Sequence, residues 1–153
     1  MRPTILAVTL LILAVIIASK LWAVQIMAEE HDVRALSAAR SLKCSFPWFA
    51  STDWGGDEPK VKTAGQEFGF HIDGIDRVKR SARIIGNAGA DDLAATYGAA
   101  SVSFIERVPV GSVNVTTVYA WRDKAGRFKA VHSRHTAIGG PSPSQNYGYC
   151  QAW

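Results

Sequence analysis

The sequence is poor in cysteine: its 153 residues include only two, Cys44 and Cys150. Two cysteines allow one intramolecular disulfide, which an oxidising compartment permits. Such a bond would close a loop of roughly 100 residues and, in the chain-entropy model, contribute about 4–5 kcal/mol to stability. Free thiols are the alternative, and no neighbouring base favours a cysteine nucleophile. We therefore predict a disulfide between Cys44 and Cys150.

The sequence also lacks runs of like charge. No stretch holds five or more charges of one sign, and the net charge is a mild +4. A nucleic-acid partner is therefore not expected. The densest basic patch, Arg77–Arg80 with Arg83, is interpreted as a solvated strand edge or turn.

One segment lacks charge altogether. Ile5–Ser19 consists almost entirely of Leu, Ile, Val and Ala, with Arg2 before it and Lys20 after it. Its length fits the apolar core of a signal peptide better than a membrane span, which needs about 20 apolar residues. If the helix continues through Ala28, the segment is instead an uncleaved anchor. We predict that residues 1–28 are a signal peptide or signal anchor and that the protein is exported to the periplasm or cell envelope.

No long helical pattern follows residue 43. Residues 29–43 have the three-to-four-residue apolar spacing of a short amphipathic helix, interpreted as a connector, and 51–62 are turn-like. Beyond them the apolar residues alternate between turn signals, which indicates short strands. The clearest strand candidates are 67–73, 81–85, 93–97, 101–107, 113–121, 128–138 and 145–151.

This pattern predicts an all-β fold, a small antiparallel β-barrel or sandwich of about eight strands, built from residues 44–153 as a single disulfide-closed domain. A bond between Cys44 and Cys150 suits closure of a barrel, because it would join the first strand to the last. Closure removes the exposed sheet edges.

Catalytic motifs are also absent: no G-x-S-x-G elbow exists, and no cofactor is expected. The segment from Val131 to His135 contains the one cluster of polar residues that could carry out chemistry. In a strand, His132 and Arg134 share one face, whereas Ser133 and His135 share the other. The two histidines therefore cannot jointly hold a metal from an unbulged strand. A hydrolase or metal-dependent enzyme using this strand remains an alternative.

We expect His132 and Arg134 to face the interior or the mouth of the barrel. The planar guanidinium of Arg134 suits an anionic ligand or an internal carboxylate. The alternative is a structural network in which both side chains are satisfied internally. The carboxylates that would complete that network are Glu67, Asp73, Asp76 and Glu106.

Aromatic residues are plentiful, and most of the Trp and Tyr side chains are expected in the core. Trp48 and Trp54 lie in a Pro- and Gly-containing segment and could instead line an opening for a ligand or partner. The candidate ligand-binding residues are therefore His132, Arg134, His135, Trp48 and Trp54.

Five short segments in the second half of the chain carry a resemblance to other sequences: 82–89, 104–106, 116–119, 130–135 and 144–150. On these pieces the chain resembles exported bacterial proteins of unknown function. At the level of architecture it is similar to periplasmic lysozyme inhibitors and lipocalin-like binders, although the inhibitors' loop motif is not recognisable. The resemblance implies no catalytic activity.

These observations favour a non-enzymatic binding protein of the cell envelope, whose partner is a small ligand or an envelope protein. An inhibitor or structural partner of an envelope protein is the further alternative, and it predicts a protruding loop at 139–144 or 51–59. Membrane attachment through the N-terminal segment accompanies the anchor alternative.

Overall fold

The computed structural model describes residues 17–20, 27, 29–87, 89–109, 111–137 and 140–153. The predicted signal peptide or anchor, residues 1–28, lies almost entirely outside the described residues. In the described part of the chain, no helix is long and apolar enough to cross a membrane.

In the described part of the chain, nine strands follow a helix that spans residues 29–38. They are β1 (Leu42–Asp53), β2 (Lys60–Gly65), β3 (Gly69–Asp76), β4 (Ser81–Gly86), β5 (Gly89–Tyr97), β6 (Ser101–Arg107), β7 (Val113–Arg122), β8 (Phe128–Thr136) and β9 (Ser142–Ala152). Successive strands from β3 to β9 pair with antiparallel neighbours, and β9 returns to β1.

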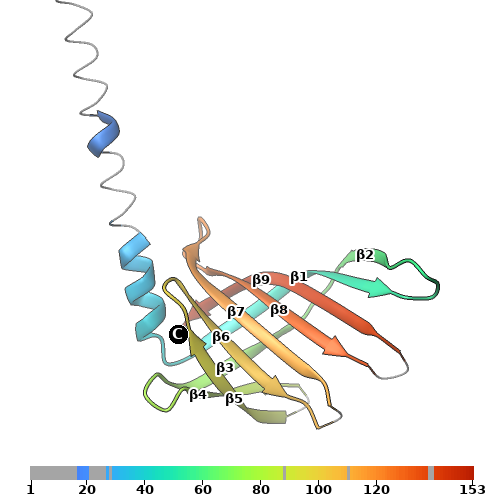
Figure 1. The fold of residues 1–153 in the computed structure, drawn as a ribbon. Helices are drawn as coiled ribbons and strands as arrows, with labels where there is room; N and C mark the ends of the chain where they lie inside the picture. Colours follow the sequence, from blue (N-terminus) through green and yellow to red (C-terminus); the bar gives the residue numbers. More distant parts are fainter. Residues whose placement is uncertain (1–16, 21–26, 28, 88, 110, 138–139) are drawn as a thin grey trace, which may run out of the picture.

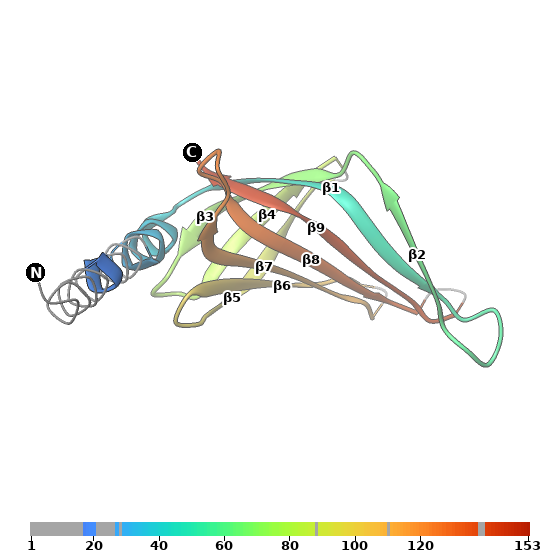
Figure 2. The same cartoon turned by 90° about the horizontal axis from the view of Figure 1, so that it is seen from above.

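The sheet closes into an eight-stranded antiparallel barrel (Figure 1). The first half of β1 pairs with β3 and the second half with β2, so that β1 contributes to the barrel and also to a hairpin beyond it. Figure 2 shows this β1–β2 hairpin projecting from the barrel on the side away from the helix. The predicted all-β barrel is confirmed.

Two boundaries differ from the prediction. The helix ends at residue 38 rather than 43, because Leu42 already pairs with Ile72 and has no solvent exposure. The segment 51–62, predicted as a turn, contains the end of β1 and the start of β2, paired from Asp53 and Lys60 onward. Every residue of β2 is exposed, so the apolar alternation that indicates a strand is missing there.

The expectation that most Trp and Tyr residues lie in the core is wrong. The largest fully buried side chains are Phe46, Phe104, Phe128, Leu42, Ile72, Val118 and Cys150. Trp48, Trp121 and Trp153 are instead 55%, 48% and 75% exposed. In β7 the residues at the odd positions, which include Tyr119 and Trp121, face outward, while Asn114, Thr116, Val118 and Ala120 are buried. Period-two alternation identifies two faces but does not say which is inside.

The helix covers one end of the barrel, which we call the closed end (Figures 1 and 2). Leu36 and Ala39 join the hydrophobic core there. Arg122 Nε, at the end of β7, lies 3.1 Å from Asp32 Oδ1 on the helix. Helix packing and this ion pair therefore seal the closed end.

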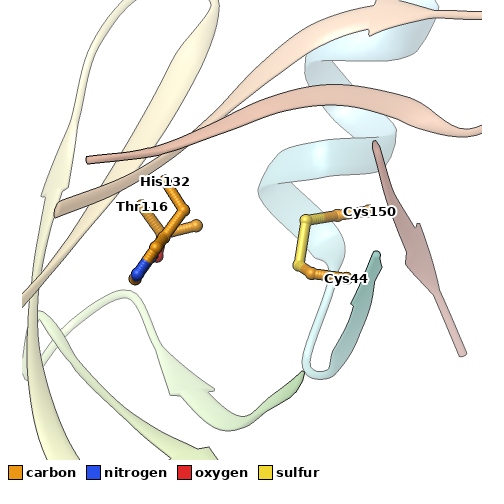
Figure 3. Close-up of a disulfide and its surroundings, with 4 residues drawn as sticks. All are labelled: Cys44, Thr116, His132 and Cys150. Atoms are coloured by element: carbon orange, nitrogen blue, oxygen red, sulfur yellow. A yellow bond between two sulfur atoms is a disulfide. The ribbon is translucent and has the colours of Figure 1, made fainter. Parts of the chain in front are cut away.

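Cys44 and Cys150 lie directly opposite each other on β1 and β9, near the closed end. Their Cα atoms are 4.1 Å apart and their Sγ atoms are at disulfide distance, 1.99 Å (Figure 3). The bond joins the two strands where the barrel closes, as the sequence predicted.

Polarity rises along the interior from the closed end toward the opposite end, which we call the mouth. On β8 the inward residues run Phe128, Ala130, His132 and Arg134. The equivalent positions run Val102, Phe104 and Glu106 on β6, and Val118, Thr116 and Asn114 on β7. The register places Glu106, Asn114 and Arg134 in one row across three strands at the mouth.

Candidate functional site

A cleft of about 320 Å³ enters the barrel at the mouth. Its chemistry comes from four strands: aromatic rings on or beside β3, a carboxylate on β6, an amide on β7, and an imidazole and a guanidinium on β8. The residues that supply these groups are Phe68, Phe70, Glu106, Asn114, His132 and Arg134.

His132 forms the inner end of this cleft and is only 2% exposed. Its Nδ1 lies 2.9 Å from Thr116 Oγ1 on the neighbouring strand. Figure 3 draws both side chains. Among the described residues, Nε2 has no hydrogen-bond partner. Burial, followed by the positive charge of Arg134, lowers the pKa of His132 to about 4. The imidazole is therefore neutral at pH 7.

Three phenylalanines surround the imidazole. The ring centroids of Phe70, Phe68 and Phe46 lie 5.2, 5.4 and 5.8 Å from that of His132. These rings exclude water from one side of the histidine and give the inner part of the cleft an apolar wall. A ligand that reaches His132 would meet both an apolar surface and a neutral polar nitrogen.

Arg134 lies two residues further along β8, closer to the mouth, and its side chain is on the same face of the strand as that of His132. Its side chain lines the cleft, and within the described chain it forms no ion pair or hydrogen bond. Of the predicted internal carboxylate partners, Glu106 accepts a hydrogen bond of 2.7 Å from Asn114, and Asp73 and Asp76 accept from Ser41 and the β3–β4 turn. Glu67 lines the same cleft as Arg134 but forms no ion pair with it. The cation is thus available at the mouth.

Two side-chain amides that do not line the cleft hold the backbone of His132. Asn146 on β9 donates through Nδ2 to the His132 carbonyl at 3.1 Å, and its Oδ1 accepts from Gln66 Nε2 at 2.6 Å. Gln66 lies between β2 and β3, so this chain ties the segment at the root of the projecting hairpin to β8 and β9. The network holds the backbone of His132 in place.

The remaining candidates lie outside the cleft. His135 is exposed on the outer face, and with Ser133 it lines a second hollow that shares Arg134 with the cleft. Because His132 is inside and His135 outside, the convergence that the enzymatic alternative required does not occur. In the part of the chain that the structure describes, no group of three or more His, Cys, Asp or Glu side chains is placed to hold a metal ion.

Trp48 and Trp54 do not line the cleft either. Trp48 lies on the outer face, opposite Tyr147 of β9, where a hollow of about 340 Å³ is also lined by Tyr119 and Lys129. Trp54 directly follows β1 in the projecting hairpin and is 46% exposed. The five candidate residues are therefore distributed over three surfaces, of which His132 and Arg134 share one.

A larger hollow of about 700 Å³ lies beside the cleft and shares Phe68 and Phe70 with it. It is also lined by Lys43 and His71, which pair across β1 and β3 and whose side chains alternate to the outer face. The buried side chains of Asn114 and His132 line the smaller cleft and not this hollow.

Sequence reasoning missed Asn114, Thr116 and Asn146, which are 9%, 4% and 4% exposed. Each occupies the same strand face as an apolar core residue: Val118 for the first two and Cys150 for the third. Polar residues in register with a core face are the signal that would have identified them.

No protein-family model, curated protein or solved structure matches this chain. The site is therefore interpreted from its own geometry.

Proposed function

We propose that the protein binds a small ligand in the cleft at the mouth of the barrel, without catalysing a reaction on it. The observation that carries this proposal is that one partly apolar cleft contains both the buried neutral imidazole of His132 and the guanidinium of Arg134, which forms no ion pair among the described residues. Small-molecule sites have this composition: apolar walls with a few convergent polar groups. Each of these two groups can form a hydrogen bond with a ligand that enters the cleft.

The proposal includes export to the cell envelope. The apolar run Ile5–Ser19 supports it from the sequence. The cysteine pair at disulfide distance supports it from the fold, because disulfides persist in oxidising compartments. Whether residues 1–28 stay attached is decided by the covalent mass of the protein from its own envelope fraction.

Native mass spectrometry of that preparation also tests ligand binding. We expect the protein to carry a non-covalently bound ligand, seen as extra mass. The fraction of protein that retains this ligand should fall at least tenfold in Arg134→Gln. Arg107→Gln is the matched control, because Arg107 is exposed on β6 near the mouth but neighbours Glu106 on the opposite face. A bare protein, or equal ligand retention in both variants, would overturn the proposal.

A second candidate function is inhibition or binding of an envelope protein through the β1–β2 hairpin. The hairpin projects beyond the barrel (Figure 2) and presents Trp54 close to an Asp53–Lys62 ion pair of 3.0 Å. Because the sequence suggests a resemblance to periplasmic lysozyme inhibitors, a lysozyme assay on bacterial cell walls is the direct test. Inhibition that Trp54→Ala removes would support this function, and unaltered lysis would exclude lysozyme as the partner.

A further inference from the structure

The mouth of the barrel carries charges of both signs on one surface. Arg134 and Glu106 occupy the same row, separated by Asn114 on the intervening strand. Two strand steps separate their backbones by about 10 Å. They form no ion pair with each other, and Glu67 adds a second carboxylate to the lining.

This arrangement argues against a simple anion as the ligand. An anion bound to Arg134 would lie close to two carboxylates, and a simple cation bound to Glu106 would lie close to the guanidinium. Like charges brought close together are unfavourable. A molecule that presents an acidic group to Arg134 and a positive group to the carboxylates meets neither penalty.

The side-chain amide of Asn114, which lies between Glu106 and Arg134, also suits a ligand that carries both charges. Asn114 donates through Nδ2 to Glu106 Oε2 at 2.7 Å, which holds that carboxylate on its side of the cleft. The amide oxygen of Asn114 has no partner among the described residues, so it can accept from a bound ammonium. Deeper in the cleft, Phe68 and Phe70 offer an apolar wall and His132 a neutral nitrogen.

We propose that the ligand is a small zwitterion of the amino-acid type, with its carboxylate on Arg134, its ammonium between Glu106 and Asn114, and an apolar side group against Phe68 and Phe70. This inference rests on the proposed function, because it names the ligand class of the same cleft. Charge-assisted hydrogen bonds of both signs would fix the orientation of the ligand, and the apolar wall would select its side group.

Three probes of one shape separate the contributions of the two charges. L-Phenylalanine carries both groups, 3-phenylpropionate lacks the ammonium, and 2-phenylethylamine lacks the carboxylate. Isothermal titration of the purified full chain gives the affinity, and backbone amide shifts locate each probe. We expect phenylalanine to bind at least about tenfold more tightly than either fragment, with shifts centred on Asn114, His132 and Arg134.

Two variants then assign the charges. Arg134→Gln should weaken the affinity for phenylalanine about tenfold and leave the affinity for 2-phenylethylamine unchanged. Glu106→Gln should also weaken the affinity for phenylalanine about tenfold, but it should leave the affinity for 3-phenylpropionate unchanged. Arg107→Gln is again the control and should change neither. Retained amide dispersion in each variant shows that it is folded.

Equal affinity for phenylalanine and one of its fragments would overturn the zwitterion and leave the cleft as a site for the corresponding anion or cation. Absence of binding by all three probes would overturn the amino-acid class. The proposed function would still stand if the native protein carries a non-covalent ligand that Arg134→Gln removes, and it would fall if the native protein is bare.

Discussion

The two ends of this barrel are built from the same alternating strands but have opposite chemistry. At the closed end, the inward positions hold Phe128, Leu42 and the two cysteines, and the helix covers them with Leu36. At the mouth, the inward positions hold Glu106, Asn114 and Arg134.

The difference teaches where stability and function are placed. Apolar burial and the disulfide concentrate at the closed end, so the strands there are fixed with few polar groups to satisfy. That anchoring allows the mouth to keep a guanidinium, that of Arg134, without a partner among the described residues. Substitutions at the closed end should therefore lower stability, whereas those at the mouth should alter binding and leave stability nearly unchanged.

The largest effect is expected from removal of the disulfide. Cys44→Ala with Cys150→Ala frees a loop with a sequence separation of 106 residues. The free energy of unfolding in urea should fall by about 4–5 kcal/mol in the chain-entropy model. The unsubstituted protein with a reductant should approach the same value. Unfolding at the same urea concentration with and without reductant would show that the bond does not stabilise the closed end.

The helix should contribute next. Leu36→Ala removes a side chain that is 7% exposed and packs in the core, and it should cost about 3 kcal/mol. Ser37→Ala, at the adjacent exposed position, is the control and should change the free energy of unfolding by less than about 0.5 kcal/mol. Equal effects of the two variants would mean that the helix does not cover the barrel in solution.

His132 lies between the two regions and should make stability depend on pH. Its pKa falls from 6.5 to about 4 on folding, so the unfolded chain takes up a proton first as the pH is lowered. The stabilising contribution is complete above about pH 6.5 and is lost as the pH falls toward 4, amounting to about 2 kcal/mol between pH 6.5 and 5.

Denaturation curves of His132→Gln against the unsubstituted protein isolate this contribution, since other groups titrate equally in both. The difference in unfolding free energy between the two proteins should narrow as the pH falls. His135→Gln, on the exposed outer face, should leave the original pH dependence intact. A pH-independent difference for His132→Gln would contradict the buried neutral imidazole.

The smallest effect on stability is expected at the mouth. Arg134→Gln removes a side chain without an ion pair among the described residues, and it should change the free energy of unfolding by no more than about 0.5 kcal/mol. The same variant should strongly weaken ligand binding. A large loss of stability would instead place Arg134 in a structural network.

Much of the architecture could be predicted from alternation and turn chemistry. The strand β6 was predicted with its observed bounds, and the strand candidates 113–121 and 128–138 correspond to β7 and β8. β2 was missed because its side chains are exposed on both faces. Of the candidate site, the shared face of His132 and Arg134 followed from strand parity alone.

The sequence by itself determined that the chain is all-β and that His132 and Arg134 share a face, because strand alternation is a local property. It also determined that the first and last strands meet at Cys44 and Cys150, because the chain has only two cysteines to pair. Only the tertiary structure decided which face is inside. Barrel closure turned Trp48 and Trp121 outward and brought Glu106, Asn114 and Arg134 into one row, because register between strands depends on the whole sheet rather than on any one segment.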